Sequence, residues 1–371
     1  MRQILTVFII TVIFKTVNGK IQCKNMRGKS VDWFVVYKLP KLSGSGTTGK
    51  EFVYIDSESS DWTRGNDIND EQVAVGATIS QAYSADKSSN FLLMYSDDDP
   101  IKEADSYRGH AKGVSLFDST TGFWLIHSVP NFPPIKSYSY PSTAEKYGQS
   151  FFCSSMEVQH LAELAEHWKY IQATPYVINL PDKFGTRFPT LKNVQAKQSL
   201  TRSATQFWIS KPIKTVQGVT LMAYAKHKKF DGDIWNDLIS KQNKVTLAVL
   251  TYRSWLNGSG DDLHTTCTDS SQTHDVTEMR VTGLNFASSK DHSKWAVSNS
   301  QTNPIVCFGD MNRQKSQLKR GGGAVCIQNR NLWQIYHSSV IQVEPCKASF
   351  HYSFFRTAII FIFLVFSVSK I

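Results

Sequence analysis

The sequence contains no Cys-x-x-Cys motif, no low-complexity tract and no short internal repeat. The missing cysteine motif argues against a structural zinc site and against a dithiol redox centre. The missing repeat argues against a solenoid. The apolar runs near the two ends are too short for membrane-spanning helices, so no stable membrane span is expected. What remains is a chain of 371 residues, long enough to bury one large core or two smaller ones.

Residues 1–19 have the features of a secretory signal peptide. A basic residue precedes a short apolar run, and the small residues Val17 and Gly19 occupy the −3 and −1 positions of a cleavage site. The other apolar stretch, in the tail at 356–371, follows the last cysteine. Its role is left unassigned, with a lipid-anchor signal as an alternative interpretation. We expect the mature chain to begin at Lys20 and to enter the secretory pathway.

The cysteine count agrees with secretion. An even number of cysteines in an oxidising compartment favours three disulfides, each contributing about 2–4 kcal/mol. The spacing alone leaves the connectivity open. Asn257 begins the only Asn-x-Ser/Thr sequon and is the predicted glycosylation site. The cysteines are Cys23, Cys153, Cys267, Cys307, Cys326 and Cys346.

Basic residues exceed acidic ones, which gives a formal net charge of +10. A positive surface attracts polyanions such as nucleic acids. Aspartates 97–99 form a local acidic run, which is interpreted as a solvated turn because a metal loop needs more oxygen ligands at defined spacing. No metal ion or other cofactor is expected.

Two His-x-Lys triplets carry the chemistry. In His110-Ala-Lys112 and His292-Ser-Lys294, the histidine and lysine are two residues apart, so on a strand both side chains lie on one face. A neutral imidazole can attack phosphorus while an ammonium group holds a phosphate oxygen. Both triplets lead into strand-like runs. The two other triplets, at residues 167–169 and 227–229, lie in a helical pattern and in a basic loop-like stretch.

The remaining pattern alternates strands with helices and predicts a mixed α/β protein. The clearest strands are 31–38, 91–95, 245–252 and 305–308. Strands on either side of a turn at 120–122 predict a hairpin, from which His127 emerges beside the first triplet. His127 is open to a structural or a proton-handling interpretation.

Helices and connections complete the prediction. Helices are predicted from Asn69 to Tyr83 and after a capping box at 154–157, and the basic stretch 182–201 is predicted to be an irregular link between two halves. Glycines 321–323 suggest a hairpin turn, with a phosphate cradle as the alternative.

Several blocks resemble the deoxyribonuclease II family, the acid endonucleases of lysosomes, in an invertebrate, nematode-like form. The resemblance extends from about Lys20 to Cys346. It is carried by residues 31–40, 109–113, 124–134, 291–295, 309–313 and 320–323.

The resemblance implies a phospholipase D-like pseudo-dimer, in which two α/β halves with mixed sheets share one active site. The halves would be 20–180 and 181–355. The implied catalytic residues are His110, Lys112, His292 and Lys294. Supporting roles are expected for His127, Asp118, Asn299 and Asn312, although the spacing after each lysine differs from the phospholipase D pattern. The implied disulfides are Cys23–Cys153, Cys267–Cys346 and Cys307–Cys326.

The implied activity is metal-independent hydrolysis of double-stranded DNA at acidic pH, leaving 3′-phosphates through a phosphohistidine intermediate. The expected location is the lysosome or, after secretion, the outside of the cell, where DNA of dead or engulfed cells is degraded. The alternatives are a secreted lipid phosphodiesterase of the same fold and a catalytically silent DNA-binding relative. The attacking histidine and the oligomeric state, a monomer with an internal pseudo-dimer or a homodimer, are left open.

Overall fold

The computed structural model describes residues 20–101, 104–253, 260–267 and 272–346. The predicted signal peptide, the sequon residue Asn257 and the apolar tail lie outside the described residues. Within the described part of the chain, no helix is both long enough and apolar enough to span a membrane.

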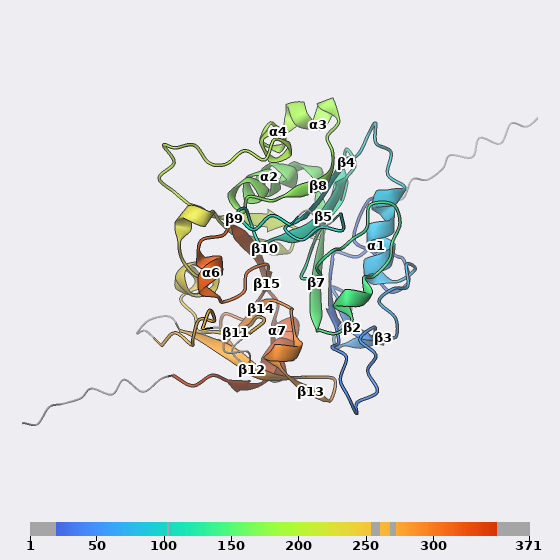
Figure 1. Ribbon diagram of the computed structural model, residues 1–371. Helices are drawn as coiled ribbons and strands as arrows, with labels where there is room; N and C mark the ends of the chain where they lie inside the picture. Colours follow the sequence, from blue (N-terminus) through green and yellow to red (C-terminus); the bar gives the residue numbers. More distant parts are fainter. Residues whose placement is uncertain (1–19, 102–103, 254–259, 268–271, 347–371) are drawn as a thin grey trace, which may run out of the picture.

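The first half of the chain forms an eight-stranded sheet, seen in blue and green in Figure 1. Its strands are ordered β3-β2-β1-β7-β6-β5-β4-β8. The runs at 33–38, 52–56 and 91–96 consist mainly of aromatic and aliphatic residues and form strands that are buried along their length. The bounds are β1 Trp33–Lys38, β2 Phe52–Asp56, β3 Thr63–Gly65, β4 Phe91–Ser96, β5 Lys112–Phe117, β6 Thr121–His127, β7 Gln149–Glu157 and β8 Pro175–Asn179.

The second half forms a nine-stranded sheet ordered β13-β12-β11-β14-β15-β16-β10-β9, with β17 paired to β12. Its bounds are β9 Trp208–Lys214, β10 Thr220–Lys226, β11 Leu247–Leu250, β12 Thr273–Val281, β13 Leu284–Ala287, β14 Trp295–Ser298, β15 Ile305–Gly309, β16 Gly322–Gln328 and β17 Val340–Val343. The predicted α/β class is confirmed. A mixed sheet is found in the second half, where β11 and β12 are parallel, whereas the strand pairs of the first sheet are all antiparallel.

The two sheets share one order of strands. The path β2-β1-β7-β6-β5-β4-β8 in the first is matched by β9-β10-β16-β15-β14-β11-β12 in the second. In each sheet, the strand that follows a His-x-Lys triplet, β5 or β14, forms an antiparallel hairpin with the next strand. The match ends at one edge, where β4 and β8 are antiparallel but β11 and β12 are parallel.

The helices are short and few among the described residues. They are α1 Ala74–Tyr83, α2 Leu161–Tyr170, α3 Asp182–Arg187, α4 Thr190–Gln195, α5 Lys241–Asn243, α6 Lys315–Leu318 and α7 Arg330–Ser339, with 3-10 turns η1 Ser142–Ala144, η2 Val158–His160, η3 Lys228–Phe230 and η6 Ser288–Lys290, and the π-helix η4 Ile234–Ser240. The predicted capping box at 154–157 is wrong, because these residues end β7. The predicted irregular link is also wrong in part, since it contains α3 and α4.

One hydrophobic core joins the halves. Residues of both sheets and of α2 and α7 form a single buried cluster, in which Phe152 of β7 stacks on Phe308 of β15 with ring centroids 5.0 Å apart. A second cluster lies between the first sheet and α1, and a third between the second sheet and η4. The shared core therefore fixes the position of one sheet relative to the other.

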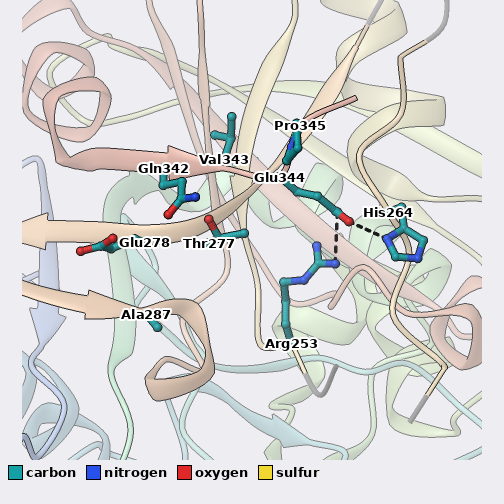
Figure 2. Close-up of a pocket in the computed structure, with 9 residues that line it drawn as sticks. All are labelled: Arg253, His264, Thr277, Glu278, Ala287, Gln342, Val343, Glu344 and Pro345. Atoms are coloured by element: carbon teal, nitrogen blue, oxygen red, sulfur yellow. Dashed lines mark hydrogen bonds and ion pairs between the residues drawn. The ribbon is translucent and has the colours of Figure 1, made fainter. Parts of the chain in front are cut away.

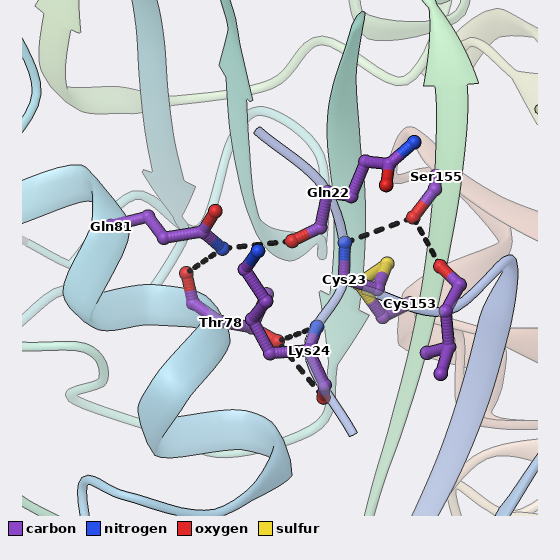
Figure 3. Close-up of a disulfide and its surroundings, with 8 residues drawn as sticks. Gln22, Cys23, Lys24, Thr78, Gln81, Cys153 and Ser155 are labelled. Atoms are coloured by element: carbon purple, nitrogen blue, oxygen red, sulfur yellow. Dashed lines mark hydrogen bonds between the residues drawn. A yellow bond between two sulfur atoms is a disulfide. The ribbon is translucent and has the colours of Figure 1, made fainter. Parts of the chain in front are cut away.

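Three disulfides join the pairs that the family resemblance implies. Figure 3 shows Cys23–Cys153, which ties the N-terminal segment to β7. The segment is held further because Cys23 N–H donates to the Ser155 hydroxyl, 2.9 Å away, and Lys24 N–H donates to the Thr78 hydroxyl of α1. Each disulfide closes within one half of the chain.

Candidate active site

The two His-x-Lys triplets each lie at the start of a strand and are held by the opposite half. His110 N–H donates to the carbonyl oxygen of Gly321 over 2.8 Å, and His292 N–H donates to that of Gly148 over 2.9 Å. Gly321 precedes β16 and Gly148 precedes β7, which are equivalent strands. The two halves therefore exchange the same kind of contact, and the exchange brings both triplets to the boundary between the sheets.

His110 has a defined orientation. Its ring Nδ1 lies 2.7 Å from the main-chain carbonyl oxygen of Asp310, and its Nε2 lies 4.0 Å from a carboxylate oxygen of Asp97. Burial lowers the pKa of His110 to about 3; Asp97 opposes this change, and Lys112 adds to it. The free imidazole is therefore neutral at lysosomal pH, with Nδ1 as the donor and the Nε2 lone pair available.

Asp97 is the centre of a buried ion-pair cluster next to His110. Its carboxylate pairs with the Lys112 ammonium group and, at 3.1 Å, with the Arg320 guanidinium group. Burial alone raises the pKa of this carboxyl, but His110, Lys112 and Arg320 together hold it well below its usual range. The interpretation of residues 97–99 as a solvated turn is therefore wrong, because Asp97 and Asp99 are buried and Asp98 is half-buried.

His292 has aromatic neighbours instead of an acid. Its ring stacks on Tyr147, with centroids 4.1 Å apart, and meets the edge of Tyr252 at 4.3 Å. Its Nε2 is buried without a hydrogen-bond partner among the described residues. Burial, followed by the charges of Lys294 and Lys112, lowers the pKa of His292 to about 3. The pKa is therefore lowered to about 3 at both histidines, but His110 lies beside a carboxylate and His292 between two tyrosines.

The residue before His292 is anchored in the core. The Asp291 carboxylate accepts hydrogen bonds from the Tyr37 hydroxyl of β1 and, at 2.7 Å, from Ser293 N–H. Burial raises the pKa of Asp291 to about 6. This network fixes the backbone on both sides of His292.

Lys294 and Asp310 titrate close to neutrality. Lys294 donates to the carbonyl oxygen of His292 over 2.7 Å, and burial together with the charge of Lys112 lowers its pKa to about 7. Burial also raises the pKa of Asp310 to about 7, against a hydrogen bond from Lys112 N–H. The Lys294 ammonium group is therefore fully charged only at acidic pH.

One small cavity brings together a histidine and two lysines of the His-x-Lys triplets, whereas His292 is not part of its lining. It is lined by residues of both halves: His110, Ala111, Lys112, His127, Ser128, Lys294 and Asp310. His127 ends β6, is buried between Phe132 and Phe151, and accepts a hydrogen bond from Val129 N–H. His110 lines the cavity together with Lys112 and Lys294. A neutral imidazole in this position can attack a phosphate whose charge the two ammonium groups neutralise.

Two predicted supporting residues lie elsewhere. Asp118 caps the β5–β6 turn through Thr120 and Thr121, at the end of β5 opposite His110. Asn299 is exposed after the far end of β14. Asn312 lies closer, two residues after Asp310, and its side-chain oxygen is buried without a partner among the described residues.

Sequence reasoning missed Asp97, Asp310, Arg320, Tyr147 and Tyr252 as site residues. Asp310 and Arg320 lie in blocks that carry the family resemblance, so these blocks could have indicated that both residues belong to the site. Asp97 directly follows a buried strand, a position from which side chains often reach a site. Nothing in the local sequence of the two tyrosines indicates that they surround His292.

A second pocket lies away from the histidines, beside β12 and β17. Figure 2 shows its charged wall, where Glu344 accepts from Arg253 at 3.3 Å and from His264 at 2.6 Å. Its lining includes no residue of either His-x-Lys triplet. The first cavity is therefore the better candidate for phosphodiester chemistry.

Comparisons with known proteins identify the family of the chain. The family model described as Deoxyribonuclease II matches residues 22–346. The chain is 85% identical to cell-death-related nuclease 7 of Caenorhabditis elegans, over 98% of this chain and 99% of that protein. It is 35% identical to deoxyribonuclease-2-alpha of Mus musculus, over 88% and 94%, and 30% identical to plancitoxin-1 of Acanthaster planci, over 92% and 97%. The chain belongs to the deoxyribonuclease II family.

Proposed function

We propose that this deoxyribonuclease hydrolyses double-stranded DNA to 3′-phosphate products by a metal-independent, two-histidine mechanism. The observation that carries the proposal is the cavity in which His110 and Lys112 of one half meet Lys294 of the other. His292, which forms the second triplet with Lys294, is proposed as the fourth catalytic residue. His127 and Asn312 are proposed to support these four residues.

His110 is proposed as the nucleophile. Its Nδ1–H donates to the Asp310 carbonyl oxygen, which leaves the Nε2 lone pair free and stabilises the positive charge that forms on the ring. Nε2 attacks the phosphorus atom as the bond from phosphorus to the 5′-oxygen breaks. His292, protonated once the phosphate anion is bound, gives its proton to that oxygen.

The second step releases the product. Neutral His292 removes a proton from a water molecule, the water oxygen attacks the phosphohistidine, and the bond from phosphorus to His110 breaks. The strand leaves with a 3′-phosphate, and His110 returns to its neutral form. Lys112 and Lys294 neutralise the phosphate oxygens in both steps. Asp97 keeps the Lys112 ammonium group in place.

Trapping the intermediate tests this assignment. A DNA with sulfur in place of the bridging 5′-oxygen has a leaving group that needs no acid. With His292→Ala, such a substrate should react once and then stall, because the variant lacks the base for the second step. Mass spectrometry should find DNA attached to the peptide that contains His110. Attachment to any other residue would contradict the assignment.

Plasmid nicking at pH 5 with a chelator present tests the function itself. Nicking with 3′-phosphate ends is the expected result. Activity that requires an added metal ion would defeat the mechanism. Hydrolysis of phospholipid vesicles without nicking would favour the lipid phosphodiesterase, and salt-sensitive DNA binding without nicking would favour the silent relative.

The biological setting is part of the same proposal. Three disulfides and the predicted signal peptide support passage through the secretory pathway to the lysosome or out of the cell. The repeated strand order supports a division at about residue 180 into halves 20–180 and 181–355, which together form a pseudo-dimer within one monomer. The names of two nematode relatives refer to cell death, which supports DNA of dead cells as the physiological substrate.

A further inference from the structure

Lys38 ends β1 and is completely buried. Its ammonium group donates to the main-chain carbonyl oxygens of Ala144 and Glu145, each at 2.9 Å, and to that of Tyr147. These three residues lie in the loop that leads into Gly148. This loop carries two residues of the first half that contact His292. Tyr147 stacks on the His292 ring, and the Gly148 carbonyl oxygen accepts a hydrogen bond from the His292 main-chain N–H.

Lys226 repeats this arrangement in the second half. It ends β10, the equivalent of β1, and is also buried. Its ammonium group donates to the carbonyl oxygens of Gln317 at 3.3 Å and Leu318 at 2.6 Å. The loop that it holds leads into Arg320, which pairs with Asp97 beside His110, and into Gly321, which accepts His110 N–H.

Strand register shows that the two lysines are equivalent. Lys38 pairs with Gln149, the residue after Gly148, and Lys226 pairs with Gly322, the residue after Gly321. Each lysine therefore lies opposite the start of a strand whose preceding glycine binds a histidine of the other half. Nothing in the proposed chemistry uses either lysine.

A buried ammonium group is costly unless its donors are satisfied. Burial lowers the pKa of Lys38 to about 7 and that of Lys226 to about 8, which shows that the cost is present. An apolar side chain would fill the same space without this cost. Main-chain carbonyl contacts at the equivalent place in both halves, three for Lys38 and two for Lys226, indicate that each lysine fixes the geometry of its loop.

We propose that Lys38 and Lys226 are positioning residues, each of which fixes the loop that holds the catalytic histidine of the opposite half. Lys38 acts on His292 through Tyr147 and Gly148. Lys226 acts on His110 through Arg320 and Gly321. The assignment of the two histidines as catalytic rests on the proposed function, whereas the control of their main-chain contacts does not.

Kinetics of Lys38→Met provide the first test. The variant keeps most of the side-chain volume but loses all three donors. Because misplacing a catalytic group by about 1 Å can cost about 100-fold in rate, kcat should fall by roughly 10- to 100-fold while KM changes by less than about 3-fold. Lys50→Met is the matched control, since the partly exposed Lys50 side chain pairs with the Glu145 carboxylate of the same loop at 3.9 Å and donates to none of its carbonyl oxygens among the described residues. The control should keep normal kcat.

A double-mutant cycle separates positioning from general destabilisation. If Lys38 acts through Tyr147, then Lys38→Met and Tyr147→Ala should lower kcat less together than the product of their separate effects. Lys226→Met and Tyr147→Ala should instead combine as independent changes. Independent effects in the first pair would overturn the proposal for Lys38.

Amide hydrogen exchange tests the proposal without using activity. Lys38→Met should speed exchange at His292 N–H by at least about tenfold and leave His110 N–H unchanged, and Lys226→Met should do the reverse. Lys38→Gln, which keeps two donors, should give an intermediate result and replaces Lys38→Met if that variant does not fold. Equal acceleration at both amides, or none, would overturn the proposal. If the variants show these predicted exchange changes but the wild-type protein does not cut DNA, the positioning proposal stands and the proposed function is rejected.

Discussion

His110 and Asp310 are 200 residues apart in the chain, yet the imidazole Nδ1 lies 2.7 Å from the Asp310 carbonyl oxygen. A carbonyl oxygen only accepts hydrogen bonds, so this contact places the ring proton on Nδ1. The neighbouring half of the molecule thereby selects the tautomer in which Nε2 can attack phosphorus. His292 has no equivalent carbonyl contact among the described residues, and the two histidines are therefore not interchangeable.

Removing either histidine should abolish DNA cleavage. We expect His110→Ala and His292→Ala each to lower kcat by on the order of 10⁴-fold, since both serve one two-step reaction, and the double variant should be about as inactive as either single one. A plasmid assay at pH 5 measures the rates. His337→Ala, at an exposed position of α7, is the control and should cleave normally. Near-normal cleavage by either single variant rules out the paired mechanism.

The pH profile should show an acidic optimum with an alkaline limb near pH 7. The free histidines lose their protons at a pKa of about 3, so the nucleophile is neutral at pH 5. Lys294, whose pKa is lowered to about 7, carries its charge below neutrality and loses it above. The fall in kcat/KM as pH rises through 7 is therefore assigned to Lys294.

Lys294→Arg tests that assignment because a guanidinium group stays charged throughout this range. The alkaline limb should move up by at least about one pH unit, whatever the loss in absolute rate, while the acid limb stays in place. The measurement is kcat/KM against pH at constant ionic strength with chelator. An unmoved alkaline limb would assign it to another group of the free enzyme.

Asp97→Asn should impair the enzyme although Asp97 takes no part in bond making. The change leaves Lys112 and Arg320 without their shared carboxylate, and breaking a buried pair costs roughly 3–5 kcal/mol. We expect a lower melting temperature and a loss of kcat/KM of about 100-fold. Asp98→Asn, which alters the adjacent contact to Asn131, is the control. Equal behaviour of the two variants would exclude a special role for Asp97.

The disulfides should differ in their effect on stability. Cys23–Cys153 spans 130 residues and Cys307–Cys326 spans 19. In the chain-entropy account, the longer loop gives the larger stabilisation, by about 1.7 kcal/mol. The paired alanine variant at 23 and 153 should therefore have a lower free energy of unfolding in guanidinium chloride than the paired variant at 307 and 326. The opposite order would show that contacts around each bridge outweigh loop entropy.

The sequence predicts well those features that depend on neighbouring residues. Alternating turns and β-branched runs predict the β5–β6 hairpin, and the two-residue spacing of histidine and lysine predicts a shared face. The family resemblance adds the disulfide pairs. Features that depend on contacts between the halves could not be predicted in this way. Tyr147 stacks on His292 because the shared core packs β7 of the first sheet against β15 of the second.

The glycines at 321–323 show the same limit. Local rules favour a turn, but the chain enters β16 here and Gly322 is its first residue. A Cβ atom at Gly322 would lie 2.0 Å from the sulfur of Met311, and one at Gly321 would lie 2.3 Å from the Ile171 carbonyl oxygen. These glycines are required by close approach to other segments, which no local pattern reveals.

The disulfides have a further consequence, because each closes within residues 23–153 or 267–346. The only covalent link between the sheets is the chain itself, which is mostly exposed from 196 to 207. A protease that cuts once in this segment would convert the enzyme into a heterodimer held together by non-covalent contacts alone, namely the shared core and the hydrogen bonds that the halves exchange. Its activity would then obey mass action: reductant would not be needed to separate the fragments, and dilution below their dissociation constant would switch the nuclease off.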